Sequence, residues 1–471
     1  MANMRPESAP FISRHYIMDN KYQAPRFNSH IYGHTGDPDT LPRSLGMLEY
    51  DQTFGAAGKL RLGNNNGWAS CILSSTAKPD YFLATYYETL NTTVPERRYA
   101  ARVARFDTAG NLDTSFGDSG TGSIEAHFTG ALGRISILDG LHETEAGEIF
   151  NWGTIAWIDN SAIYKTFAIT KRLSSGTLDS SFGLEGKVDI HTLVDFDAQL
   201  VGGNACIVSS TAIFIGIGEF NKSPPNYHIL RLTPEGALDP TFQNGGILTP
   251  RHPDYPNKLI SIVGLSQSQD GGILVCGTTH RSDGAGMSGL IMKFDNGGNI
   301  DKSFGTNGFS ETRILGQFPE FYSVCNAPPL MLVAGTSTTK QGPESLVGLY
   351  SAIGSPDESF NGGEPAVHAF IDPPYLDKWH QANVAAQTPG KVIAVGSWDL
   401  PTSSGPVVGR FNMDGSVDEA FMPGLTKFGT LTDANFFSNA STGFVQLSPD
   451  RILVAGVTGG KPAILAIKVR R

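Results

Sequence analysis

Cysteine is scarce in this 471-residue chain, and no two cysteines are closely spaced. The four cysteines never form a C-x-x-C pair, which excludes a zinc knuckle and a dithiol redox motif. Each lies in an apolar, strand-like stretch, so we expect buried free thiols, which suit a reducing compartment. They are Cys71, Cys206, Cys276 and Cys325.

Positive charge and long apolar runs are also lacking. Charged residues make up 17% of the chain and the formal net charge is −10, with no basic stripe. This excludes a nucleic-acid binder and disfavours anionic membrane surfaces. Apolar runs such as residues 212–218 are too short to span a bilayer. The N-terminus has no apolar signal region, so we expect a cytoplasmic protein, with export by another route left open.

Glycine, in contrast, is abundant, and one short pattern recurs along the chain. The 55 glycines and 28 prolines are spread among β-branched and aromatic runs, which indicates many short strands joined by tight turns. The pattern Asp-x-x-Phe occurs seven times, at intervals of 56 to 66 residues. Its members are Asp51 and Phe54, Asp113 and Phe116, Asp179 and Phe182, Asp239 and Phe242, Asp301 and Phe304, Asp357 and Phe360, and Asp418 and Phe421.

Other positions keep step with this pattern. Six copies have a glycine three residues before the aspartate, preceded by a strand that ends in a basic–apolar pair such as Arg105-Phe106. An apolar strand closed by glycine, such as residues 273–277, follows each aspartate; in the first copy Thr85 stands in the place of the glycine. Each copy therefore predicts four short strands. Repeats of this length built only from strands are typical of propeller blades.

The two ends of the repeat region predict how the ring closes. It opens near residues 58–62 with a strand like the fourth strand of a blade. It ends near residues 463–470 with a strand like the third, in which Lys468-Val469 is expected to occupy the place that Arg105-Phe106 holds in its own copy. We expect these strands to pair, which leaves no open sheet edge. The sequence thus predicts an all-β, seven-bladed β-propeller of four-stranded antiparallel blades over residues 51–471.

Residues 1–50 lie outside the repeat. They include six aromatic residues and balanced charges, which is unlike a disordered tail. We expect this segment to be an N-terminal arm that packs on the propeller as a lid. A partner-docking arm is the alternative.

The repeated turn resembles that of the delta-60 repeat family of bacterial β-propellers. The resemblance rests on the Gly-x-Leu-Asp-x-Ser-Phe-Gly-x-x-Gly turn and on the strands in residues 268–277 and 448–456. It covers residues 51–471 and implies a propeller fold. That family has no assigned common chemistry, so the resemblance implies no activity and no cofactor.

The repeated residues are interpreted as structural. An aspartate in a tight turn accepts hydrogen bonds from the backbone two residues later, and the serine or threonine at that position adds a second bond. The phenylalanine is expected to fill the space between adjacent blades. A residue that recurs in every blade is expected to stabilise the blades, so functional residues are sought where the copies differ.

The copies differ most on one face, in the connections between blades and between the second and third strands. Variable loops on a rigid ring are a usual place for recognition. Three segments combine aromatic side chains with carboxylates or histidines; the alternative is that they only cover the sheet ends. Their candidate binding residues are Asp372, Tyr375, Asp377, Trp379 and His380; Asp195 and Asp197; and His252, Asp254 and Tyr255.

No known catalytic pattern is present. The chain has no G-x-S-x-G, no H-E-x-x-H and no phosphate-binding loop. His127, His191, His252 and His368 recur near the outermost strands, too far apart to share a metal ion. We therefore expect a non-catalytic scaffold that binds a protein or glycan, without catalytic residues, metal or cofactor. The alternative is a hydrolase or lyase acting on carbohydrate at the mouth of the central channel.

Overall fold

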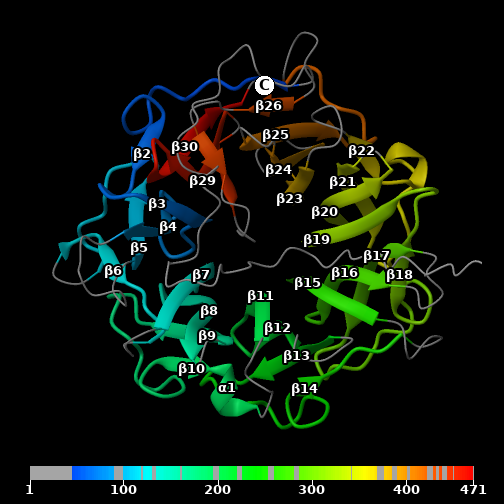
Figure 1. Ribbon diagram of the computed structural model, residues 1–471, viewed down its shortest axis with the longest axis horizontal. Coiled ribbons are helices and arrows are strands. Elements are labelled where there is room, and N and C mark those ends of the chain that lie inside the picture. Colours follow the sequence, from blue (N-terminus) through cyan, green and yellow to red (C-terminus); the bar gives the residue numbers. More distant parts are fainter. Residues whose placement is uncertain are drawn as a thin grey trace, which may run out of the picture.

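The computed structural model of the chain is a ring of antiparallel sheets around a central axis (Figure 1). We number the blades in chain order from the first complete sheet. The residues that the structure describes are 45–89, 99–117, 120–129, 134–159, 162–194, 201–219, 225–252, 259–280, 286–340, 342–368, 376–384, 390–399, 404–421, 428–430, 434–436, 443–448 and 450–469.

The first three blades each have four strands in chain order from the axis outward. Blade 1 contains β3 (Gly67–Ser74), β4 (Tyr81–Thr89), β5 (Tyr99–Asp107) and β6 (Ser123–Glu125). Blade 2 contains β7 (Arg134–Glu143), β8 (Ile149–Asp159), β9 (Ala162–Arg172) and β10 (Lys187–Asp189), followed by the short helix α1 (Ile190–Leu193). Blade 3 contains β11 (Val201–Val208), β12 (Ile213–Glu219), β13 (Asn226–Leu232) and β14 (Ile247–Leu248).

The next three blades repeat this plan. Blade 4 contains β15 (Leu259–Gln267), β16 (Ile273–His280), β17 (Met287–Phe294) and β18 (Phe309–Thr312). Blade 5 contains β19 (Phe318–Ala327), β20 (Leu330–Thr339), β21 (Gly342–Ser351), a 3₁₀ turn (Asn361–Gly363) and β22 (Ala366–His368). Blade 6 contains β23 (Leu376–Val384), β24 (Lys391–Asp399), β25 (Ser404–Asn412) and β26 (Phe428–Thr430), and β1 (Leu45–Met47) extends its outer edge in parallel.

Blade 7 joins the two ends of the chain. It contains β27 (Ala434–Phe436), β28 (Phe444–Ser448), β29 (Arg451–Thr458) and β30 (Lys461–Lys468), with β2 (Lys59–Arg61) as its outermost strand. β2 pairs antiparallel with β30, with Leu60 opposite Ile464. The described strands thus form seven sheets in all, and the predicted all-β propeller of four-stranded antiparallel blades is confirmed.

One detail of this junction differs from the sequence prediction. The amide of Asp51 donates to the carbonyl of Ala466, as the amide of Asp113 does to Arg105. Ala466-Ile467 therefore occupies the place of Arg105-Phe106, and the assignment of Lys468-Val469 to that place was wrong by two residues. Lys468 is the basic residue near the end of β30, but the position that corresponds to Arg105 holds Ala466, so the lysine gave the wrong register.

Part of the predicted arm lies within the described residues. Leu45–Met47 form β1, which is paired with Phe428–Thr430, and Leu48 lies in the apolar cluster between blades 6 and 7. Residues 1–44 lie outside the described part of the chain. No helix in the described residues is long and apolar enough to cross a membrane.

The core lies between the blades. The central strands are buried almost throughout because a neighbouring sheet covers each of their faces, as in β12 and β16. Seven apolar clusters bridge neighbouring blades, and each contains one phenylalanine of the repeated pattern, 0–2% exposed. The repeated glycine of the next blade packs on that ring: an added Cβ at Gly298 would lie 2.6 Å from Phe242.

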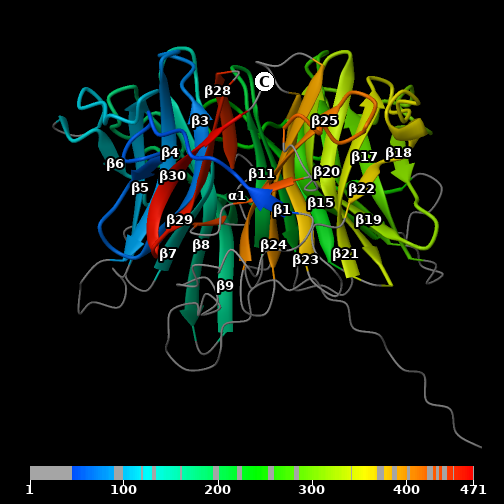
Figure 2. The same ribbon diagram turned by 90° about the horizontal axis from the view of Figure 1, so that it is seen from above.

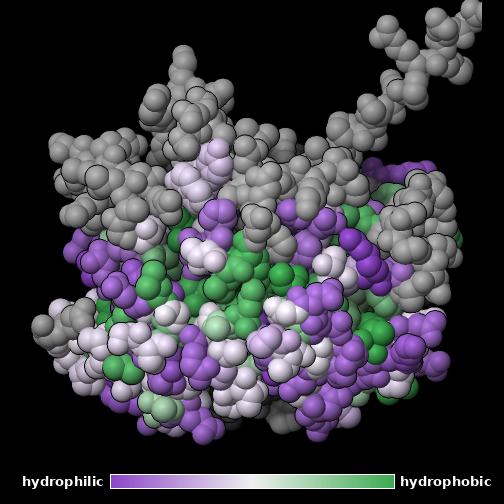
Figure 3. Space-filling model, turned by 90° about the horizontal axis from the view of Figure 1, so that it is seen from below, coloured by the Kyte–Doolittle hydropathy of each residue, from purple (hydrophilic) through white to green (hydrophobic). Residues whose placement is uncertain are grey.

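The ring has two different faces (Figure 2). We call the face with the Asp-x-x-Phe turns, and the turns between the first and second strands, the repeat face. The opposite face carries the connections between blades and between the second and third strands, and we call it the variable face. On the side of the rim seen in Figure 3, apolar atoms gather near β10, α1 and β14, where Leu193, Ile247 and Leu248 are half-buried.

Candidate functional site

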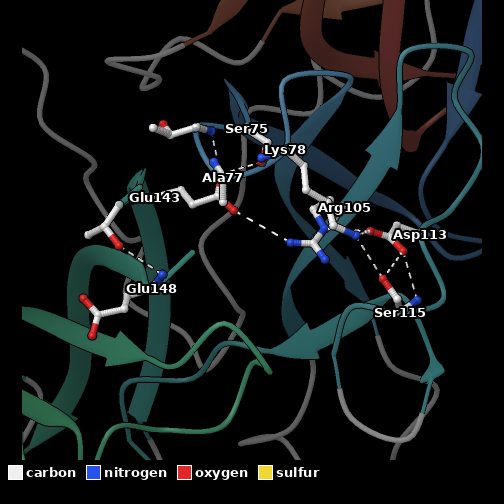
Figure 4. A network of polar contacts seen from close by, with 10 residues as sticks. Ser75, Ala77, Lys78, Arg105, Asp113, Ser115, Glu143 and Glu148 are labelled. Carbon is white, nitrogen blue, oxygen red and sulfur yellow. Dashed lines mark hydrogen bonds and ion pairs between the residues drawn. The ribbon is translucent and has the colours of Figure 1, made fainter. Parts of the chain in front are cut away.

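The repeat face is occupied by structural contacts. In blade 1, Asp113 Oδ1 accepts hydrogen bonds from the Ser115 amide (3.0 Å) and hydroxyl (2.5 Å), while Oδ2 binds Arg105 Nε (2.8 Å) and Lys78 Nζ (3.0 Å) (Figure 4). These bonds hold the pKa of the Asp113 carboxyl well below its usual range, against the opposing effect of burial.

The same network joins blade 1 to blade 2. Glu143, at the end of β7, is 1% exposed and accepts hydrogen bonds from the Ser75 hydroxyl (2.6 Å) and the Thr76 amide (2.7 Å) of the neighbouring blade. Arg105 Nη1 lies 3.8 Å from its other oxygen. The Glu143 carboxylate therefore links blade 2 to blade 1.

A hollow of about 400 Å³ on the repeat face of blade 4 is lined by another ion pair of a repeated aspartate. Lys293 lines it and pairs with Asp270 (2.6 Å) and Asp301 (3.0 Å). Lys293 lowers the pKa of Asp270 to about 2. The charges of this hollow satisfy one another, so it is a poor candidate for a ligand site.

The innermost strands carry a second repeated feature, which the sequence did not reveal. Six of them contain a β-bulge midway along the strand, where the pairing with the second strand slips. In blade 7 the innermost strand is interrupted at the corresponding place: Phe436 pairs with Gly456 and Phe444 with Val454, on either side of residues 437–443. Bulges are over-represented beside active sites because they redirect a side chain.

The bulge explains the repeated glycine of the second strand. An added Cβ would lie 1.9 Å from the Ile137 carbonyl oxygen at Gly153 and 1.9 Å from that of Glu320 at Gly335. The glycine is needed because the bulged strand brings its backbone against this position. In blade 1 the pairing of Ala69 with Tyr86 shows that Tyr86, not Thr85, stands in its place.

The bulged residues differ in chemistry, and this distinguishes them from the repeated turn. The single bulged residues are Ser70, Asp139, Val263, Tyr322 and His380, and β11 bulges at Gly203 and Asn204. We take this ring of bulges, together with the variable face, as the candidate functional region.

Asp139 is a strongly perturbed acid among these bulged residues. The residue is only 4% exposed, and this burial raises the pKa of its carboxyl to about 7. Thr154 Oγ1, which donates to it at 3.3 Å, and the charge of Lys165 act in the opposite direction. Burial also lowers the pKa of Lys165. A carboxyl that titrates near neutrality can exchange protons with a ligand.

Tyr322, another bulged residue, has an acidic neighbour. Its hydroxyl donates to Glu320 Oε2 at 3.3 Å, from two residues earlier in β19. Burial, with the charge of Glu320, raises the pKa of the Tyr322 phenol well above its ordinary value. The phenol therefore stays protonated and can donate its hydrogen bond to Glu320.

The β8–β9 hairpin is an aromatic feature of the variable face. Its two strands have 11 residues each and extend farther beyond that face than their neighbours (Figure 2). Trp157 and Tyr164 form a cross-strand pair whose rings stack with centroids 5.4 Å apart and planes 12° apart. Both side chains are half-buried, so part of each ring remains accessible.

Two histidine–carboxylate pairs lie on opposite faces of blade 3, away from the axis: His252 faces blade 4, and His228 faces blade 2. His252 is 6% exposed, lies 3.0 Å from Glu311 Oε1 and packs against Phe309. His228 Nε2 lies 3.6 Å from Glu219 Oε2, and its Nδ1 is 2.8 Å from Thr249 Oγ1. Hydroxyl, imidazole and carboxylate follow one another, but the 3.6 Å gap is too long for a hydrogen bond.

The structure describes only some of the predicted binding residues. Asp377, Trp379 and His380 lie in β23, at and before its bulge, and His252 is the buried partner of Glu311. The other predicted residues, Asp372, Tyr375, Asp195, Asp197, Asp254 and Tyr255, lie outside the described residues.

Metal-binding geometry is absent from the described part of the chain, where no three histidine, cysteine or acidic side chains converge. The histidines near the outermost strands have local partners instead. His127 pairs with Glu125 at 3.0 Å and the His368 ring packs against Phe411.

Part of blade 3 matches one family model. Residues 214–242, from β12 through Phe242, match the family described as "Domain of unknown function (DUF5122) beta-propeller". No curated protein matches the chain.

Three solved structures align with much of the chain at low identity. The β-propeller domain of the Trilobed protease from Pyrococcus furiosus is 8% identical, with 86% of this chain and 95% of that chain covered and a TM-score of 0.41. Drosophila Semaphorin 2a is 10% identical, with 90% and 76% covered and a TM-score of 0.49. Pyrococcus horikoshii acylaminoacyl peptidase is 10% identical, with 84% and 50% covered and a TM-score of 0.40. These likenesses carry no argument about activity.

Proposed function

We propose that the protein is a non-catalytic binding scaffold: a closed seven-bladed ring of the delta-60 repeat type that recognises a glycan or protein through its variable face. The difference between the residues of the two faces supports this. The repeated aspartates and phenylalanines of the repeat face serve the contacts between blades, whereas the variable face carries residues that differ from copy to copy.

The observation that carries the proposal is the β8–β9 hairpin. A stacked Trp157–Tyr164 pair on a projecting, regularly paired hairpin offers a rigid aromatic surface. Such surfaces bind sugar rings or apolar side chains at a low cost in conformational entropy. The predicted residues Asp377, Trp379 and His380 belong to β23, the innermost strand of blade 6, and form part of this proposal.

The test is binding to a glycan array and to a peptide array, followed by affinity measurements on the best probe. Tyr164→Ala is expected to weaken binding at least 10-fold by removing the accessible ring. Tyr81→Ala, a half-buried tyrosine on the repeat face, is the matched control and is expected to bind like the wild type. Equal affinity of Tyr164→Ala and the wild type would remove the hairpin from the proposal.

The predicted segment around Tyr375 is tested separately. Replacement of residues 369–375 by a short Gly-Ser turn is expected to reduce binding to the same probe. If this variant and Tyr164→Ala both retain full affinity, the variable face is not the recognition surface.

Asp139 favours a second candidate, a carbohydrate hydrolase or lyase with its site at the mouth of the channel. A carboxyl with a pKa of about 7 on an innermost strand is suited to general acid catalysis. Incubation with a panel of polysaccharides, followed by measurement of released reducing ends, tests this candidate. Activity that disappears in Asp139→Asn would replace the scaffold proposal, and absence of release across the panel would leave the scaffold in place.

A further inference from the structure

One blade lacks a contact that the other six share. In those six blades a lysine or arginine binds Oδ2 of the repeated aspartate, at 2.5 to 3.2 Å. The cation lies eight positions before the aspartate in five of them, as in Arg105 and Asp113. In blade 7 Arg451, the first residue of β29, supplies it.

In blade 5 an apolar residue stands in each of these places. The amide of Asp357 donates to the Leu349 carbonyl at 3.0 Å, which is the bond that Asp113 makes with Arg105. Leu349 therefore occupies the cation position. Leu330, the first residue of β20, occupies the place of Arg451.

The carboxylate of Asp357 nevertheless keeps the other half of the pattern. Its Oδ1 accepts from the Ser359 amide at 2.9 Å and the Ser359 hydroxyl at 2.7 Å. Within the described residues, no lysine or arginine pairs with its Oδ2. Since the capping bonds use Oδ1, the turn does not need Oδ2, and that oxygen is left without the ligand that its six counterparts hold.

The surroundings of Asp357 suit a basic partner. Glu358 is exposed beside the aspartate, and Ile353, four residues earlier in the chain, is 61% exposed on the same face. Asp414, in the turn of the next blade, joins this region through the bond from the Asn361 amide to its carbonyl oxygen (2.8 Å). The formal net charge of −10 favours cationic over anionic partners.

We propose that Asp357 is a docking point for a lysine or arginine side chain of a partner protein, which completes from outside the ion pair that the other blades make internally. Ile353, exposed on the same face, offers an apolar surface for other residues of that partner. This surface lies on the repeat face, so it is separate from the recognition surface proposed for the variable face.

The experiment uses an array of short peptides in which a lysine or arginine is flanked by apolar residues, each paired with a copy carrying norleucine or citrulline instead. The wild-type chain is expected to bind a subset of the cationic peptides and to lose at least 10-fold in affinity for their neutral copies. Leu349→Lys supplies the missing cation within the blade and is expected to weaken binding at least 10-fold.

Leu349→Met is the matched control, because it keeps the position apolar and is expected to bind like the wild type. Thermal unfolding of both variants checks that they are folded, and Asp357→Asn, which retains a capping oxygen, is expected to reproduce the loss seen with Leu349→Lys. Absence of any cation-dependent peptide binding, or undiminished binding by Leu349→Lys and Asp357→Asn, would overturn the proposal. A loss in Tyr164→Ala with none in these variants would support the variable face alone.

Discussion

The guanidinium of Arg451 binds the carboxylate of Asp51, 400 positions earlier in the chain, with 2.5 Å between Nε and Oδ2. Its Nη2 donates to Thr53 Oγ1 at 2.8 Å, and its Nη1 donates to the carbonyl of Thr108 in the next blade at 2.7 Å. One side chain thus connects the last blade, the start of the repeat region and blade 1. It acts at the same seam as the pairing of β2 with β30.

Replacement of Arg451 by methionine is expected to weaken this seam. The pair is largely shielded, with side-chain exposures of 19% and 14%, so we expect the free energy of unfolding to fall by about 2 kcal/mol. Chemical denaturation measures the change. Lys468→Met, at an exposed position of the same blade, is the control and is expected to change stability by less than about 0.5 kcal/mol. Equal stability of the two variants would show that the Arg451–Asp51 contact contributes nothing to closure.

The phenylalanines of the repeat are expected to be among the most sensitive positions. Phe116 and Phe304 are 0% and 1% exposed and lie in clusters that bridge two blades. Truncation of either to alanine leaves a cavity between rigid sheets and is expected to cost about 3–5 kcal/mol, measured by denaturant unfolding. Leu184→Ala, at a side chain 80% exposed, is expected to be nearly neutral. A cost below about 1 kcal/mol at both phenylalanines would place them outside the core.

The repeat could be recognised in the sequence because every copy forms the same turn and the same contact between blades. Asp-x-x-Phe recurs since each turn needs a capping carboxylate and each blade boundary needs a large apolar side chain. The ion pair was missed, although its signal was present: a basic residue precedes the aspartate by eight positions, as in Lys171 and Asp179. The two residues come together only when the third strand and its turn fold back on each other.

The bulges could not be predicted, because nothing local requires their residue types. Ser70, Asp139 and Tyr322 occupy the same place in three blades and share no chemistry. The repeated glycine across from them was visible, but its cause is the carbonyl of a strand some fifteen residues away. The candidate loops were selected by their amino-acid composition, and composition does not determine which side chains come into contact.

The glycine opposite the bulge gives a direct test of this geometry. Gly335→Ala places a Cβ 1.9 Å from the Glu320 carbonyl oxygen, and the backbone must move to relieve the contact. We expect a loss of about 2–3 kcal/mol in the free energy of unfolding. Gly271→Ala is the control: its φ is +82° but nothing lies within 4 Å, so only backbone strain of about 1 kcal/mol is expected. An equal cost at both positions would mean that the bulge does not press on Gly335.

Asp139 is expected to make stability depend on pH in a direction opposite to that of most carboxylates. Its pKa is about 7 in the folded protein and near 3.9 in the unfolded chain, so between these values the folded state holds the proton more tightly. The free energy of unfolding contributed by this group therefore falls as pH rises from about 4 to 7, by on the order of 3–4 kcal/mol.

Asp139→Asn cannot ionise, so its stability is expected to decline less than that of the wild type between pH 5 and pH 8, as measured by denaturant unfolding at each pH. Asp80→Asn, at an exposed aspartate, is the control and is expected to follow the wild-type curve. Parallel curves for the wild type and Asp139→Asn would mean that Asp139 is already ionised at pH 5. Such a carboxyl would carry no proton at neutral pH, and the hydrolase or lyase alternative would lose the observation that favours it.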